Sequence, residues 1–251
     1  PMQNSSNPFE HSLLVQSENH ENDQGQTITF NPLAPATYGD PVIILLATTT
    51  SGLTVTFESD NLSVATISGN LLTIIGAGTA NIIASQLGDG NYDPAADVVQ
   101  VLTVSKATLS ATTDNKTKIY GDPNPAFTIT YTGFKGSDNA SAIDTPPTIA
   151  SDATQFSPVD SYDILFMTSG TDNNYLINLS TEGLLTITKA PLAATADDMT
   201  KIYGEPNLPL SITYTGFKGS DNAAVIDAPP TIATEVTQYS PADFYSISFM
   251  S

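Results

Sequence analysis

Residues 130–139 read TYTGFKGSDN, and the same ten residues return unchanged at 213–222. The two stretches lie 83 residues apart, and no insertion or deletion separates the two copies from Ala107 and Ala190 onward. Self-similarity at a fixed period is typical of proteins built from tandem modules. The sequence is therefore that of a modular array, and its function depends on what a string of similar modules can do.

Charge excludes several classes of partner. The 251 residues include 26 acidic and 7 basic side chains, which gives a net charge of −19, and all the basic residues are lysines. Such a chain repels phosphate backbones and anionic membrane surfaces, so no nucleic-acid partner is expected. No run of 18 apolar residues occurs, so no membrane insertion is predicted.

The residue types used by common catalytic sites are missing from the repeated part of the chain. Cysteine is absent, and the two histidines, His11 and His20, lie near the start of the sequence. The modules therefore offer neither a Ser-His-Asp triad nor a cysteine nucleophile. Several acids recur 83 residues apart, as Asp114 and Asp197 do, and a recurring acid fits a turn or another structural role better than catalysis. The chain is not predicted to be an enzyme.

Apolar residues alternate with polar ones in short segments, which is typical of half-buried β-strands. In the second repeat these are Phe127, Ile129 and Tyr131, then Tyr162, Ile164 and Phe166, and finally Leu185 and Ile187. Pro, Gly, Asn and Asp separate the segments, a spacing typical of two-sheet sandwiches. The predicted fold class is all-β, with tandem immunoglobulin-like β-sandwich modules in an elongated array.

The repeat divides the chain into four parts. Residues 1–26 form a polar leader, 27–106 form module 1, 107–189 form module 2 and 190–251 form module 3. Module 3 copies module 2 but has no equivalent of residues 169–189, so it lacks the last two strands. The lysines before the Tyr-Gly turns, Lys118 and Lys201, are expected to be exposed.

Four motifs of module 2 carry a family resemblance. They are Tyr-Gly-Asp-Pro-Asn-Pro at 120–125, Tyr-Thr-Gly-Phe at 131–134, Asp-Asn-Asn-Tyr at 172–175 and Leu-Thr-Ile-Thr-Lys at 185–189. Together they resemble the MBG-type bacterial immunoglobulin-like repeat, and module 1 resembles a neighbouring bacterial immunoglobulin-like type. The resemblance implies β-sandwich modules in large secreted, often adhesin-like surface proteins, notably of Bacteroidota. It supplies no catalytic residues.

A calcium loop is the one cofactor site that the residues indicate. Asp89, Asn91 and Asp93 place three oxygen-bearing side chains at alternate positions, as calcium loops do. Pro94 replaces the usual glycine, and no bidentate glutamate follows, so a solvated hairpin turn is the competing interpretation. Glycan binding also remains open, although the chain contains no tryptophan.

The missing strands of module 3 leave two explanations open. Either a longer protein completes the module, or another copy of the chain donates a strand to it. The candidate donor residues are Phe9, Leu13 and Val15, and the candidate acceptors are Tyr245, Ile247 and Phe249. The expected partners are therefore other copies of the chain or further repeats of a longer protein.

The function predicted from these features is mechanical and spatial. The links at Lys106-Ala107 and Lys189-Ala190 are very short, which favours a semi-rigid rod. We expect an extracellular stalk, spacer or fibre segment of a bacterial cell-surface or adhesin-like protein, which could polymerise head-to-tail by strand addition. The alternative is a glycan- or calcium-binding module of a secreted protein.

Overall fold

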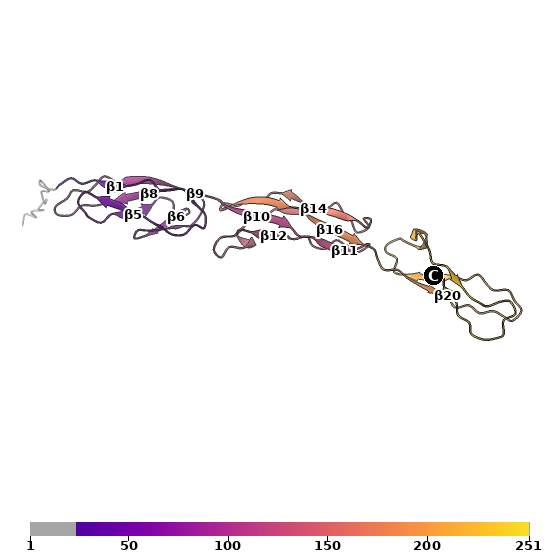
Figure 1. Cartoon of the computed structure of the whole chain (residues 1–251). Helices are drawn as coiled ribbons and strands as arrows, with labels where there is room; N and C mark the ends of the chain where they lie inside the picture. The colour runs from indigo at the N-terminus through magenta and orange to yellow at the C-terminus, as the bar shows by residue number, and fades with distance from the viewer. Residues whose placement is uncertain (1–23, 251) are drawn as a thin grey trace, which may run out of the picture. The chain divides into compact units, whose positions relative to one another are not determined.

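The computed structural model describes residues 24–250, and these residues form an all-β structure (Figure 1). The predicted all-β class is confirmed; the helical structure in the described part is limited to two single turns, η1 (Ala140–Ala142) and η2 (Ala223–Val225). The described residues form no apolar helix of membrane-spanning length. By their internal contacts the described residues form two compact units that divide between Ala107 and Thr108, and the second contains modules 2 and 3 apart from Ala107.

The strands are short in all three modules. Module 1 contains β1 (Ile28–Phe30), β2 (Ala36–Thr37), β3 (Ile43–Ile44), β4 (Ala47–Thr49), β5 (Thr56–Ser59), β6 (Ala65–Ser68), β7 (Leu71–Ile74), β8 (Gly78–Ser85) and β9 (Val98–Ser105). Module 2 contains β10 (Ala107–Thr113), β11 (Lys116–Ile119), β12 (Ile129–Thr132), β13 (Thr148–Ala150), β14 (Ser161–Thr168), β15 (Tyr175–Thr181) and β16 (Gly183–Thr188). Module 3 contains β17 (Ala193–Ala196), β18 (Ile212–Thr215), β19 (Ile232–Ala233) and β20 (Ser248–Phe249).

Module 1 encloses one core between its sheets. The sheet β2-β9-β8-β5 contributes Ile82 and Leu102, and the sheet β3-β7-β6 contributes Leu72. Phe30, from the third sheet β1-β4, packs into the same cluster. Residues from separate sheets therefore share one interior, as the layers of a sandwich do.

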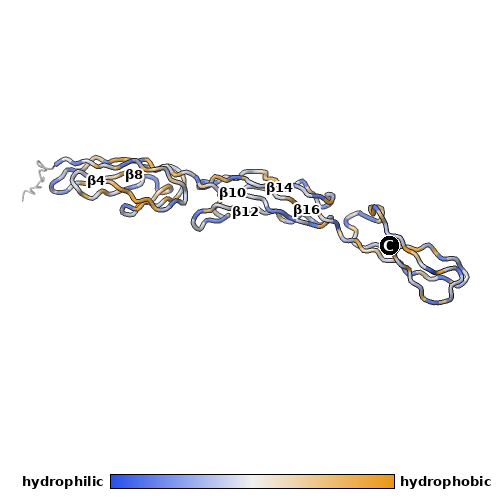
Figure 2. Tube along the Cα trace, viewed as in Figure 1, coloured by the Kyte–Doolittle hydropathy of each residue, from blue (hydrophilic) through white to orange (hydrophobic). Residues whose placement is uncertain are grey.

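Period-two burial explains why these sequences form strands. In β10 the buried positions are Ala107, Leu109, Ala111 and Thr113, with less buried residues between them. Successive side chains of a strand point to opposite faces, so this alternation places one face on the core and the other toward solvent. Figure 2 shows hydrophobic stretches in every module, so apolar residues are not gathered in one part of the chain.

Module 2 has two sheets, β12-β10-β15 and β11-β16-β14-β13. The predicted inward residues Ile164, Leu185 and Ile187 are almost completely buried and form a core cluster with Ala153. Phe127 packs against this cluster although it precedes β12 by two residues. Most of the pairing is antiparallel, but β11 and β16 pair in parallel, with Lys116 opposite Leu185 and Ile119 opposite Thr188.

Module 3 forms two separate two-stranded sheets, β17-β18 and β19-β20. None of its described residues, 190–250, is buried. Ile164 of module 2 has 0 % of its surface exposed, whereas its equivalent Ile247 is half-buried. The reason is that Ile164 lies in β14 beside β16, and the sequence has no equivalent of β16 in module 3.

This difference predicts unequal effects of one substitution in the two repeats. Ile164→Ala should lower the free energy of unfolding of module 2 by about 2–5 kcal/mol, because it opens a cavity in a closed core. Ile247→Ala, the matched change in module 3, should cost much less because that side chain is already partly in water. Native-state hydrogen exchange, measured module by module, checks both values. Equal losses in the two modules would contradict the prediction.

Candidate functional site

The calcium candidate of module 1 is a turn that is capped by its own aspartate. Asp89 Oδ1 accepts hydrogen bonds from the backbone N–H groups of Asn91 at 2.8 Å and Tyr92 at 3.1 Å. Gln24 pairs with the same loop through Asn91 O and the N–H of Asp93. Among residues 24–250 no group of three or more His, Cys, Asp or Glu side chains is placed to hold a metal ion. The turn accounts for Asp89, and calcium binding by Asp89, Asn91 and Asp93 stays a prediction.

The equivalent turn of module 2 is more deeply built into the fold. Asp172 is buried, and its Oδ1 accepts the N–H groups of Asn174 and Tyr175, each at 2.7 Å. Its Oδ2 accepts the N–H of Asp144 at 3.1 Å, and Asp144 Oδ2 in turn accepts the N–H of Asn173. Both acids therefore serve as turn caps.

Tyr175 links that turn to the repeated TYTGFKGSDN loop. Its hydroxyl donates to Asp138 Oδ2 at 2.6 Å and accepts the N–H of Lys135 at 2.8 Å. Its ring and that of Phe134 form a T-shaped pair, with 5.6 Å between ring centroids. Sequence reasoning did not assign this role to Tyr175. The signal for it was the tyrosine that ends the Asp-Asn-Asn-Tyr motif.

The lysine before the Tyr-Gly turn is buried in module 2, so the expected exposure of Lys118 is wrong. Its Nζ donates to three backbone oxygens, those of Asp122 at 3.0 Å, Thr154 at 2.7 Å and Gln155 at 3.1 Å. Each of the three N–H donors of the ammonium group thus has a backbone acceptor, and these hydrogen bonds replace those to water that burial removes. In module 3, Lys201 makes the same type of contact with Thr237 O and Gln238 O.

Asp114 is held by two threonine hydroxyls, one from β12 and one from the residue just before it. Thr128 and Thr130 donate to its carboxylate, the latter at 2.7 Å. The hydrogen bond from Thr128, followed by that from Thr130, lowers the pKa of Asp114, and the charge of Lys116 adds to this effect. Asp197 repeats the arrangement in module 3, where a hydrogen bond from Ser211 lowers its pKa.

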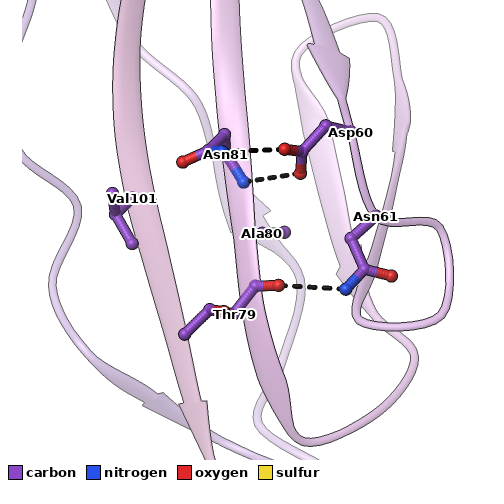
Figure 3. Close-up of a pocket in the computed structure, with 6 residues that line it drawn as sticks. All are labelled: Asp60, Asn61, Thr79, Ala80, Asn81 and Val101. Carbon is purple, nitrogen blue, oxygen red and sulfur yellow. Dashed lines mark hydrogen bonds between the residues drawn. The ribbon is translucent and has the colours of Figure 1, made fainter.

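A shallow hollow lies on module 1, between residues of β8, Val101 of β9 and the turn at Asp60 and Asn61 (Figure 3). Both carboxylate oxygens of Asp60 are engaged by Asn81, through its backbone N–H at 2.8 Å and its side-chain amide at 2.7 Å. Asn61 donates to Thr79 O at 3.0 Å. The polar groups of this hollow thus bond to one another, and no aromatic ring is among the residues that line it. This arrangement does not favour a sugar site.

The uncovered face of module 3 contains the predicted strand acceptors. Tyr245 and Phe249 are exposed, Ile247 is half-buried, and of the three only Phe249 lies in β20. In the described structure β20 pairs with β19 alone, whereas β14 pairs with both β13 and β16. The edge that β16 occupies in module 2 thus has no described strand beside it in module 3. The predicted donors Phe9, Leu13 and Val15 lie outside the described residues.

Comparison with protein families identifies the repeat. The model of the MBG domain (YGX type) matches residues 109–186 and 192–251, which is more than half of the chain. The chain belongs to the MBG domain family. Both matched segments contain the Tyr-Gly pair, at 120–121 and 203–204. The resemblance to MBG-type repeats is confirmed, whereas an origin in Bacteroidota stays a prediction.

Other comparisons add little to the MBG assignment. No curated protein matches the chain. Among solved structures, the crystal structure of the S-layer protein rSbsC is similar over 90 % of this chain and 37 % of that one, at 13 % identity and a TM-score of 0.27. The chain thus spans well under half the length of that structure. A similarity this weak supports no conclusion about fold or function.

The buried lysine of the first MBG domain gives a testable prediction. Lys118→Met should lower the free energy of unfolding of module 2 by about 1–3 kcal/mol, because buried carbonyl groups lose their donor. Lys201→Met is the matched change in module 3, where the lysine is less buried, and it should cost less. Chemical denaturation followed by two-dimensional NMR separates the modules. If the free energy of unfolding of module 2 did not change, the three hydrogen bonds of Lys118 would make no net contribution to stability.

Asp114 predicts an acid-sensitive contribution to the stability of the same MBG domain. Its pKa is lower in the folded chain than the value of about 3.9 expected in the unfolded chain. The contribution is therefore fully present above about pH 4 and is lost as pH falls through the folded pKa. Asp114→Asn should flatten the stability of module 2 between pH 5 and pH 2. Asp163→Asn removes one carboxylate from an exposed position of β14 and is the matched charge control.

Proposed function

We propose that this chain is a load-bearing repeat segment, a stalk, spacer or fibre subunit, of an extracellular bacterial surface protein. Membership of the MBG family and the tandem repetition of the domain support this assignment. The proposal includes no enzymatic activity. Asp114 and Asp144, which recur as Asp197 and Asp227, hold hydroxyl and backbone N–H groups of the fold, which gives them a structural reason to recur.

The mechanical proposal rests on one observation: in modules 1 and 2, a strand from the first part of the module pairs in parallel with its last strand. In module 2, β11 pairs in parallel with the last strand, β16. In module 1, β2 pairs in parallel with the last strand, β9, with Ala36 opposite Val104. Tension applied at the two ends of such a module pulls these strands in opposite directions along their length. All the hydrogen bonds between them are then loaded together instead of one after another.

Module 3 has an uncovered face because the sequence has no equivalent of residues 169–189 there. This face supports the proposal that other residues complete the module. Burial of apolar surface contributes roughly 25 cal/mol per Å². Exposed Tyr245 and Phe249 therefore favour a covering strand. A longer protein could supply it as the next residues of the repeat. A second copy could instead supply it with Phe9, Leu13 and Val15, which would build head-to-tail fibres.

Glycan binding is the second candidate, and one feature favours it. Tyr203 and Tyr239 are about two-thirds exposed, and their rings meet edge to face with 6.3 Å between centroids. Exposed aromatic rings are a frequent element of sugar sites. A glycan array probed with the chain and with Tyr203→Ala tests this candidate, since sugar binding that is lost in the variant would support it.

Single-molecule stretching tests the load-bearing proposal. Modules 1 and 2 should each unfold in a separate high-force event, and unfolding of the 83 residues of module 2 should lengthen the tether by up to roughly 300 Å. Module 3, in which no described strand takes the place of β16, should extend at low force. Modules 1 and 2 that open at forces as low as module 3 would overturn the proposal.

Two variants of the chain distinguish completion of module 3 by the residues that would follow it from completion by a strand of a second copy. A copy of residues 169–189 appended after Ser251 supplies the missing strands in sequence, and a third high-force event should then appear. Deletion of residues 1–20 tests strand donation between copies. Filaments seen by electron microscopy that vanish on this deletion would support donation, whereas a monomer that is indifferent to it would exclude donation.

A further inference from the structure

Two loops of the MBG repeat meet where module 2 is followed by module 3. Lys218 Nζ, from the repeated TYTGFKGSDN loop of module 3, lies 2.9 Å from Asp122 Oδ1 of module 2. Tyr120 lies two residues before Asp122, and burial, followed by a hydrogen bond to the carboxylate of Asp221 in the same loop, raises its pKa. Two separate polar contacts therefore join the Tyr-Gly-Asp turn of one domain to the lysine loop of the next.

Glycines let the two loops come close together. A Cβ at Gly121 would overlap the side chain of Lys218, and a Cβ at Gly219 would lie 2.6 Å from Phe156 Cε1. Both glycines also have positive φ, at 83° and 57°, which their turns require. The loops thus pack against each other in addition to forming the ion pair.

The second MBG domain carries the same turn, and no loop of the described residues covers its glycine. Tyr203, Gly204 and Glu205 repeat Tyr120, Gly121 and Asp122, and Tyr239 repeats Phe156. In the described residues no atom lies within 4 Å of a Cβ placed on Gly204, whereas Gly121 is covered by Lys218. The turn of module 3 thus has a carboxylate, a glycine and an aromatic ring, as the turn of module 2 does, but no described loop packs over it. The covered state therefore comes from the neighbouring module and does not come from the turn itself.

We propose that the Tyr-Gly-acid turn of one MBG domain and the lysine loop of the next form a joint that fixes the orientation of successive domains. The occupant of the turn is the Phe-Lys-Gly-Ser-Asp loop of a following MBG domain, as residues 217–221 are for module 2. The ion pair of the joint is partly exposed, with 33 % of the Lys218 side chain and 43 % of the Asp122 side chain accessible. Dissolved salt therefore screens it, and the joint loosens as ionic strength rises. This inference does not depend on where the protein is located.

The experiment uses the full chain, which contains no cysteine and so allows selective labelling. Spin labels are attached to Asn178→Cys in β15 and Thr195→Cys in β17, both at exposed positions. The distance distribution between them, measured by pulsed electron paramagnetic resonance at low salt, should show one narrow peak. At about 1 M salt, where the screening length is about 3 Å, the peak should broaden.

Charge reversals decide whether the ion pair is responsible. Asp122→Lys and Lys218→Glu should each abolish the narrow peak, and the double variant should restore it because the charges are exchanged. Glu205→Lys is the matched control, since it makes the same charge change at the equivalent turn of module 3. The proposed joint would be contradicted if the single charge reversals left the peak narrow. It would also be contradicted if the control Glu205→Lys broadened the peak as much as they do. Circular dichroism verifies that every variant is folded.

Discussion

In module 2, β16 is hydrogen-bonded to β11 on one side and to β14 on the other, and its Leu185 and Ile187 fill the core. The other features of the module depend on this last strand. It closes the sheet, covers Ile164 and provides the parallel pairing near the module's two ends. Module 3, without a described strand in that place, has no buried residue between 190 and 250. A two-layer domain of this size cannot keep a dry core with part of one layer missing.

Many polar groups inside and around the modules are used to hold loops. Asp172 and Asp89 cap the turns that contain them, and Lys118 gathers three backbone oxygens around one ammonium group. A buried charge is tolerated only when hydrogen bonds replace its water, and this condition is met here by the backbone. Some of the acidic residues of the chain therefore have a structural role.

Two kinds of interaction act along the chain, and they differ in strength and in sensitivity to solvent. Within a module, β11 and β16 are joined by a ladder of backbone hydrogen bonds that salt does not screen. Between modules 2 and 3, one partly exposed ion pair and one tyrosine hydrogen bond connect two loops. The proposed joint would therefore make bending between modules 2 and 3 sensitive to salt without any change in the folded modules.

The sequence by itself determined the all-β class, the MBG family and the inward direction of Ile164, Leu185 and Ile187, because repetition and period-two alternation are local patterns. The module boundaries stay predictions from that repetition. Tertiary structure alone decided the burial of Lys118, the parallel partner of β11 and the pairing of Asp122 with Lys218. Lys118 meets Thr154 across 36 positions, and Asp122 meets Lys218 across 96. Contacts over such separations follow from the path of the chain between sheets and modules, which no short stretch of residues encodes.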